Sequence, residues 1–203
     1  MGCGCLVLVL VALIIGGLFL KNRIEDFIEN EVAEFVTDEP VELPEVSAES
    51  KEIDALIDRF DTFREEVSSV GEEQAPQRLE LDSREINILI AHHPLFADIA
   101  NKARVELQDG IITAQVSFPL DNLIPVVGGG YLNGQAAVSL RAENGAATLI
   151  LESLEVNGKA LPEEIMSQLK GENLLEDGQT TFGRVESIVV QDSVLIIEGK
   201  AAR

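Results

Sequence analysis

His92 and His93 are the only histidines in the chain, and they are adjacent. Neighbours on a helix point about 100° apart, so this pair cannot bind one metal ion as histidines four positions apart can. We therefore expect the two histidines to end a helix. The triple glycine at 128–130 could cradle an anion, but no helix with Lys and Ser or Thr follows it, which favours a flexible connection.

No catalytic pattern accompanies these residues. The sequence contains no nucleophile elbow, Walker loop, EF-hand pattern, HExxH or CxxC pair. The acidic pairs at 72–73, 163–164 and 176–177 lack the spaced oxygen ligands of a calcium site. We therefore predict no catalytic residue, no metal site and no cofactor, and expect that the protein is not an enzyme.

An apolar loop is the most suggestive candidate for binding. Between 118 and 127, where polar turn residues are expected, the chain carries Leu120, Leu123, Ile124, Val126 and Val127. An apolar loop is either buried or in contact with something apolar. The simpler interpretation is that it covers one end of the core; the alternative is a contact with a membrane or a lipid.

Residues 2–20 are uncharged and largely apolar. At about 1.5 Å per residue they approach the roughly 30 Å of a hydrocarbon core. A cleavable signal peptide needs a basic segment before this run and a small-x-small site after it, and neither is present. We predict a single-pass signal anchor at 1–20, with residues 6–20 in the membrane. Lys21 and Arg23 on its C-terminal side favour a cytoplasmic domain under the positive-inside rule.

Charge excludes one class of partner. Residues 24–73 hold 18 acidic and 3 basic residues, a net of −15 out of −21 for the chain. A nucleic-acid backbone would be repelled by this surface, and with no Trp and one Tyr the chain lacks aromatic platforms for stacking bases. We predict no nucleic-acid partner.

Two amphipathic helices follow the anchor. Apolar positions at helical spacing predict one at 24–36, and Pro40 and Pro44 then mark an extended acidic linker. A second helix ends before Gly71. Its stripe either docks on the sheet, the simpler interpretation, or contacts a partner; it comprises Ile53, Leu56, Ile57, Phe60, Phe63 and Val67.

The rest alternates mainly with period two. A capping box at 82–85 predicts a short helix that Pro94 ends. Hairpins are predicted around Asp109-Gly110, around Asn144-Gly145 and around 191–192, and a short helix is predicted to begin at Pro162. We therefore expect an α+β fold with a curved antiparallel sheet of about six strands and one inserted helix. The predicted units are an anchor at 1–20, a juxtamembrane helix and linker at 21–48, and a domain at 49–203.

The segments LDSREINILI, VELQDGIITAQVSFPLD, YLNGQAAVSL and VNGKALPEEIMSQLKGENL carry a resemblance over residues 79–202. In their order, the chain resembles small bacterial membrane-anchored proteins of the YpmS type and, more distantly, LmeA-like proteins, whose domains are similar to tubular lipid-binding folds. The resemblance implies a curved sheet wrapped on helices, held outside the cytoplasmic membrane, with no catalytic residues. The acidic stalk and the second long helix depart from it.

Two functions follow as hypotheses. The first is a non-enzymatic, tethered module of the cell envelope that binds a lipid or another apolar ligand. It rests on the apolar loop and on the apolar run at 146–151, because ligand pockets are mostly apolar. The alternative is an assembly protein that contacts itself or a partner membrane protein through its amphipathic helices.

Overall fold

The computed structural model describes residues 36–68, 77–119, 130–143, 146–160, 166 and 185–199. Several predictions lie outside these residues: the anchor at 1–20, the amphipathic helix at 24–36 apart from Val36, the apolar loop residues 120–127, the glycines 128–129, the hairpin turn at Asn144-Gly145, the acidic pairs at 72–73, 163–164 and 176–177, and the helix from Pro162 apart from Met166. Within the described part of the chain, no helix has the length and apolar character needed to cross a bilayer.

The fold is α+β, as predicted. Its helical elements are α2 (Ser50–Ser68), α3 (Ser83–His92) and the short 3-10 helix η2 (Pro94–Phe96). The strands, all paired antiparallel, are β1 (Arg78–Asp82), β2 (Ala103–Gln108), β3 (Ile111–Pro119), β4 (Tyr131–Glu143), β5 (Ala146–Val156), β6 (Lys159–Ala160), β7 (Val185–Gln191) and β8 (Val194–Gly199).

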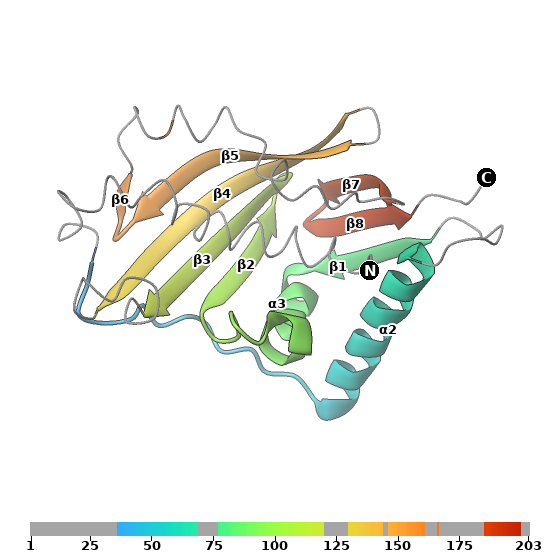
Figure 1. Cartoon of the computed structure of the whole chain (residues 1–203), viewed down its shortest axis with the longest axis horizontal. Helices are drawn as coiled ribbons and strands as arrows, with labels where there is room; N and C mark the ends of the chain where they lie inside the picture. The colour runs from blue at the N-terminus through green and yellow to red at the C-terminus, as the bar shows by residue number, and fades with distance from the viewer. Residues whose placement is uncertain are drawn as a thin grey trace.

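The prediction of one sheet with about six strands is wrong in its layout. The described strands form a five-stranded sheet of order β2-β3-β4-β5-β6 and a three-stranded sheet of order β1-β8-β7 (Figure 1). The difference arises mainly from β1, which pairs with β8 in a register that joins Arg78 to Glu198. Partners so far apart in sequence leave no local turn signal.

Local signals account for the element boundaries. Asp82 Oδ1 accepts from the Glu85 backbone N–H at 2.7 Å and Glu85 Oε2 accepts from the Asp82 N–H at 3.1 Å, which confirms the capping box. His93 caps the C-terminus of α3, as expected for the histidine pair. The β2–β3 hairpin turns at Asp109 and Gly110, both with positive φ. The β7–β8 turn lies one residue later than predicted, at 192–193.

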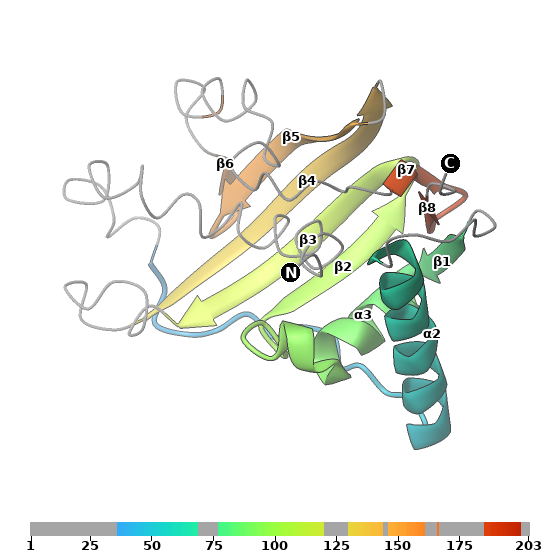
Figure 2. The ribbon, with the colours of Figure 1, turned by 45° about the vertical axis from the view of Figure 1, so that its right-hand side comes forward.

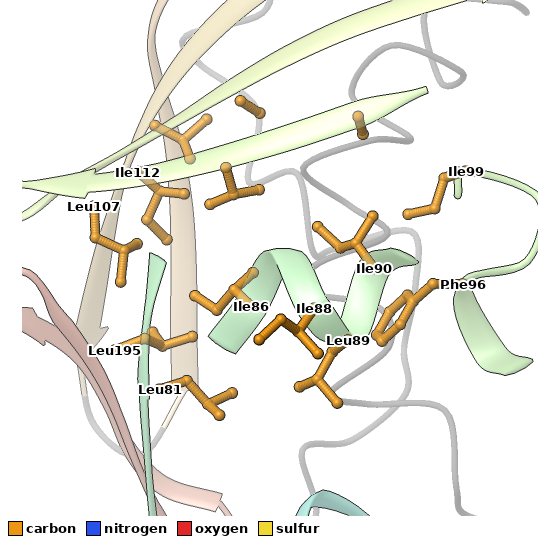
Figure 3. Packing of buried hydrophobic residues seen from close by; sticks show 14 of the residues in the cluster. Leu81, Ile86, Ile88, Leu89, Ile90, Phe96, Ile99, Leu107, Ile112 and Leu195 are labelled. Atoms are coloured by element: carbon orange, nitrogen blue, oxygen red, sulfur yellow. The ribbon is translucent and has the colours of Figure 1, made fainter. Parts of the chain in front are cut away.

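The core surrounds α3, which lies between α2 and the five-stranded sheet (Figures 1 and 2). Four apolar side chains of α3 are fully buried; Ile86 lies on the side of Ile112, and Ile90 lies further along the helix on the side of Ile99 (Figure 3). Phe60 of α2 is also fully buried and meets the His93 ring edge-on, with 5.1 Å between ring centroids. The helix α2 therefore docks inside the domain, chiefly on α3 and also on β1, and its Phe60 reaches Phe96 of η2.

Residues 36–49, here called the strap, pass from β4 along the β3 and β2 ends to the start of α2 (Figure 1). Thr37 forms an antiparallel bridge with Tyr131 at the start of β4. Near the other end, Val46 and Ala48 pack against the core. The described part of the predicted linker is thus extended, as expected, and lies against the domain.

Candidate functional site

The five-stranded sheet has one apolar and one polar face, because successive strand residues point to opposite sides. The apolar face includes the buried Val105, Ile112 and Ala114. On the opposite face the strand register aligns one row of polar side chains across four strands, from Arg104 through Gln115 and Gln135 to Glu155. A second row, Ser117 beside Asn133, follows it. The strap crosses this polar face.

Asn133 clamps the strap. Its side-chain Oδ1 accepts from the Val41 backbone N–H at 3.1 Å, and its Nδ2 donates to the Glu39 carbonyl at 3.0 Å and to Thr37 Oγ1 at 2.6 Å. The Ser117 hydroxyl donates to the same Oδ1 at 2.7 Å. Asn133 is 7% exposed, so these bonds replace the water that its amide loses on burial.

Two arginines hold the rest of the strap through its carbonyl groups. Arg104 Nε donates to the Pro44 carbonyl at 2.6 Å, and Arg84 Nη2 donates to the Ser47 carbonyl at 3.0 Å. Burial lowers the pKa of the Arg104 guanidinium from its ordinary value because charge is less well solvated there. The strap is therefore fixed to the sheet and to α3 at several points along its length, mostly through backbone groups of the strap.

A pocket of about 400 Å³ lies between the strap and the polar row. Polar side chains and apolar surface both contribute to its lining, with apolar surface the larger part; the lining residues are Thr37, Val41, Gln115, Val116, Asn133, Gly134, Gln135, Glu155, Asn157 and Gly158. Asn157 and Gly158 have positive φ and form the tight turn from β5 to β6. Both polar atoms of the Asn157 side chain are buried and have no hydrogen-bond partner among the described residues.

Among the described residues, one His–Asp pair could invite a catalytic interpretation. His93 Nε2 lies 3.2 Å from Asp61 Oδ1, and His93 Nδ1 accepts from the Leu95 backbone N–H at 3.1 Å. This places the proton of the neutral ring on Nε2, facing the carboxylate. The ring is 4% exposed and packs between Phe60 and Phe96, so the pair joins α2 to the start of η2. The described residues also contain no group of three or more His, Cys, Asp or Glu that could hold a metal ion.

The predicted partner stripe of α2 belongs largely to the core. Leu56, Phe60 and Phe63 are buried, and Ile53, Ile57 and Val67 are partly buried against them. In this fold the first three cannot contact another protein. The five apolar loop residues, Leu120, Leu123, Ile124, Val126 and Val127, lie outside the described residues, so the predicted lipid contact there stays a prediction.

The sequence-based reasoning missed the polar face altogether. Ser117, Asn133 and Arg104 sit at alternating strand positions and were indistinguishable from ordinary solvated residues. One signal was present: Asn157-Gly158 between two apolar runs is typical of a two-residue hairpin turn. That pattern predicts the turn, but it does not predict the unpaired amide.

No protein-family model matches this chain, and no curated protein or solved structure is significantly similar to it. The resemblance to YpmS-type and LmeA-like proteins therefore stays an expectation. What the chain can do is inferred below from its own residues.

Proposed function

We propose that the chain is a non-enzymatic module, tethered to a membrane by residues 1–20, that binds a lipid or another apolar ligand on the apolar face of its five-stranded sheet. One observation carries the proposal: this apolar face continues beyond α3 onto β4 and β5. There Leu132, Ala136 and Leu154 are only partly buried.

Side-chain size supports the same location. Ala114, Ala136 and Leu154 align across β3, β4 and β5, and the neighbouring row places Gly134 between Val116 and Val156. Small residues at the centre of an apolar sheet face leave more room above it than the Leu and Ile side chains near α3. An acyl chain fits such a strip because apolar surface is removed from water without requiring polar partners.

Lipid crosslinking in vesicles tests this proposal on the full chain. The protein is reconstituted with a phospholipid carrying a photoactivatable diazirine in its acyl chain, and crosslinked peptides are mapped after proteolysis. We expect crosslinks in β3, β4 and β5 in addition to any in residues 1–20. Crosslinks confined to residues 1–20 would contradict the proposed ligand face.

A matched pair of variants identifies the face. Ala136→Leu adds bulk on the apolar side of β4, whereas Ala137→Leu adds the same bulk at the next residue, on the opposite side. We expect Ala136→Leu to reduce crosslinking in the strands about tenfold and Ala137→Leu to leave it within about twofold, since only the first fills the strip. Equal effects of both variants would count against the assignment.

The assembly hypothesis is less well supported by the described residues. Three of the six residues in the α2 stripe that it invoked are buried, and the other three are partly buried against the core. A role in assembly would rest on the stripe at 24–36, of which only Val36 is described. We therefore favour ligand binding.

We also propose that the domain lies outside the cytoplasmic membrane, as the YpmS-type resemblance implies, although Lys21 and Arg23 favour the opposite orientation. Labelling of intact cells tests this. Glu42 is exposed on the strap, so Glu42→Cys, in a chain whose Cys3 and Cys5 are replaced by Ser, should react with a membrane-impermeant maleimide. Labelling only after lysis would place the domain inside.

A further inference from the structure

The clamp at Asn133 shows what an amide side chain on this sheet face can bind. Asn133 accepts from the Val41 N–H and donates to the Glu39 carbonyl, two residues earlier in the same extended segment. One planar amide thus pairs with one donor and one acceptor of a peptide backbone. This recognition does not depend on the side chains of the bound segment.

Asn157 offers the same group directly beside the clamp. Its backbone N–H donates to the Asn133 carbonyl at 2.8 Å, which fixes the turn next to β4. Its own Oδ1 and Nδ2 are buried and unpaired within the described part of the chain. Buried donors and acceptors are nearly always paired in folded proteins, so an unpaired amide at the wall of a pocket points to a missing partner.

The charge around the pocket selects among possible partners. None of its ten lining residues is basic, and Glu155 is an exposed carboxylate on its wall. The strap adds the exposed Asp38, Glu39 and Glu42 beside it. An anionic ligand such as a phosphate would be repelled here, whereas lysine or arginine side chains would be attracted.

We propose that this pocket binds an extended segment of a partner protein that carries lysine or arginine side chains. The Asn157 amide turns to pair with its backbone, as Asn133 pairs with the strap, and Glu155 contacts its cations. The bound segment lies alongside the strap on the polar face of the sheet. This site shares Val116 and Gly134 with the apolar face proposed for lipid, but Asn157 and Glu155 do not belong to that face, so either proposal can fail without the other.

Fluorescence anisotropy with a defined peptide tests the proposal. The probe is fluorescein-labelled acetyl-Lys-Val-Lys-Val-Lys-amide, and the matched control peptide has Glu in place of each Lys. The full chain is used in micelles of a zwitterionic detergent without a sugar headgroup, so that the detergent does not compete as a glycan. We expect saturable binding of the lysine peptide, at least tenfold tighter than that of the glutamate peptide and weakened by salt.

Variants connect binding to the proposed residues. Asn157→Gly removes the amide but keeps a residue that tolerates positive φ, so the turn is retained. Asn101 also has positive φ and is exposed in a separate turn, so Asn101→Gly is the matched control. We expect Asn157→Gly to weaken binding about tenfold, for two lost hydrogen bonds, Glu155→Gln about threefold at low salt, and Asn101→Gly less than twofold.

Four outcomes would overturn the proposal. The first is no saturable binding of the lysine peptide to the wild-type chain, and the second is equal binding of both peptides. The third is an unchanged affinity in Asn157→Gly, which would mean that water suffices as the partner of this amide. The fourth is tighter binding of a neutral oligosaccharide, tested with chitotriose, that Asn157→Gly weakens, because the pocket would then belong to a glycan.

Discussion

Replacing Asn133 with Ala should release the strap without unfolding the domain. The substitution removes four hydrogen bonds: those donated to Thr37 and Glu39, and those accepted from Val41 and Ser117. At about 1 kcal/mol each, the simple sum is about 4 kcal/mol. Val41 N–H keeps a bond of 3.3 Å to Ser117 Oγ, and the strap groups regain water once it lifts, so we expect about 3 kcal/mol.

A loss of this size should strongly favour release of the strap while leaving the core folded. A loss of about 3 kcal/mol raises the population of the released strap on the order of a hundredfold, since about 1.4 kcal/mol is tenfold. The effect on global stability cannot exceed the free energy with which the strap docks, because an already released strap loses nothing more. The buried apolar residues around α3 all lie outside the strap, of which only Val46 and Ala48 pack against them, so we expect the core to stay folded when the strap is released.

Hydrogen exchange of the full chain in detergent micelles measures this release locally. The Val41 amide should exchange on the order of a hundredfold faster in Asn133→Ala, while amides in α3 should be unchanged. A glutamyl endopeptidase should also cut faster after Glu42, which is exposed on the strap. Gln135→Ala is the control, because Gln135 is exposed two residues later on the same face.

Two results would refute this reasoning. If the Val41 amide exchanges equally fast in Asn133→Ala and in wild type, the clamp does not hold the strap. If amides in α3 accelerate as much as that of Val41, strap and core unfold as one unit, and the strap is not a separable element.

Three further predictions concern the core, the strap bridge and a surface ion pair. Phe60→Ala removes a fully buried ring and should lower the free energy of unfolding by about 3 to 5 kcal/mol, measured by urea denaturation; a loss below 1 kcal/mol would contradict its place in the core. Gly130→Ala places a Cβ 3.0 Å from the Thr37 carbonyl oxygen, at a residue whose φ is +104°. It should weaken strap docking by about 1 to 3 kcal/mol and make the Thr37 amide exchange faster. Unchanged exchange of this amide would exclude the clash. Arg84 hydrogen-bonds Glu52 and lowers the pKa of that carboxyl. The stabilisation from this ion pair is present above the ordinary carboxyl pKa and is lost as pH falls through the lowered value. The urea midpoint of wild type should therefore exceed that of Glu52→Gln at neutral pH, and the two midpoints should converge in acid.

Local chemistry made part of this fold predictable. The capping box at Asp82 needs only residues three apart, and the turn at Asp109-Gly110 needs only neighbours with positive φ. The strands on either side of that turn pair in register over their length. Each of these features is decided within a short segment, so a reading of the sequence can identify it.

The pairing of β1 with β8 could not be predicted in this way, because it joins segments that are far apart in the sequence. Leu79 and Leu81 are buried in a strand of five residues, a pattern too short to be distinguished from a loop with two apolar residues. The partner strand ends at Gly199, where an added Cβ would lie 2.8 Å from a Val67 side-chain atom of α2. Three segments that are distant in sequence thus specify each other, and no single one carries the signal.

The strap was correctly predicted to be extended, but its docking was not foreseen. The reason is chemical: apart from the Thr37 hydroxyl, the strap groups that bind the sheet and Arg84 are the Val41 N–H and the carbonyls of Glu39, Pro44 and Ser47. Backbone groups are the same at every non-proline position, so the strap sequence contains no sign of them. The information lies instead in the polar residues of the sheet that meet those groups.

Docking of the strap also sets how far the domain can lie from a membrane that holds residues 1–20. With the strap bound from Thr37 onward, only residues 21–36 remain to span the gap between bilayer and domain. Release up to the start of α2 at Ser50 frees thirteen more residues, which add about 45 Å of reach when extended. Thr37 and Val41 of the strap line the pocket beside Asn157. A peptide segment bound in that pocket would therefore contact the strap, whose docking limits the distance between domain and membrane. A ligand that binds more tightly when the strap is docked must therefore shift the strap toward the docked state and hold the domain close to the membrane. By linkage, the factor by which the ligand favours docking equals the factor by which release of the strap lowers the affinity for the ligand.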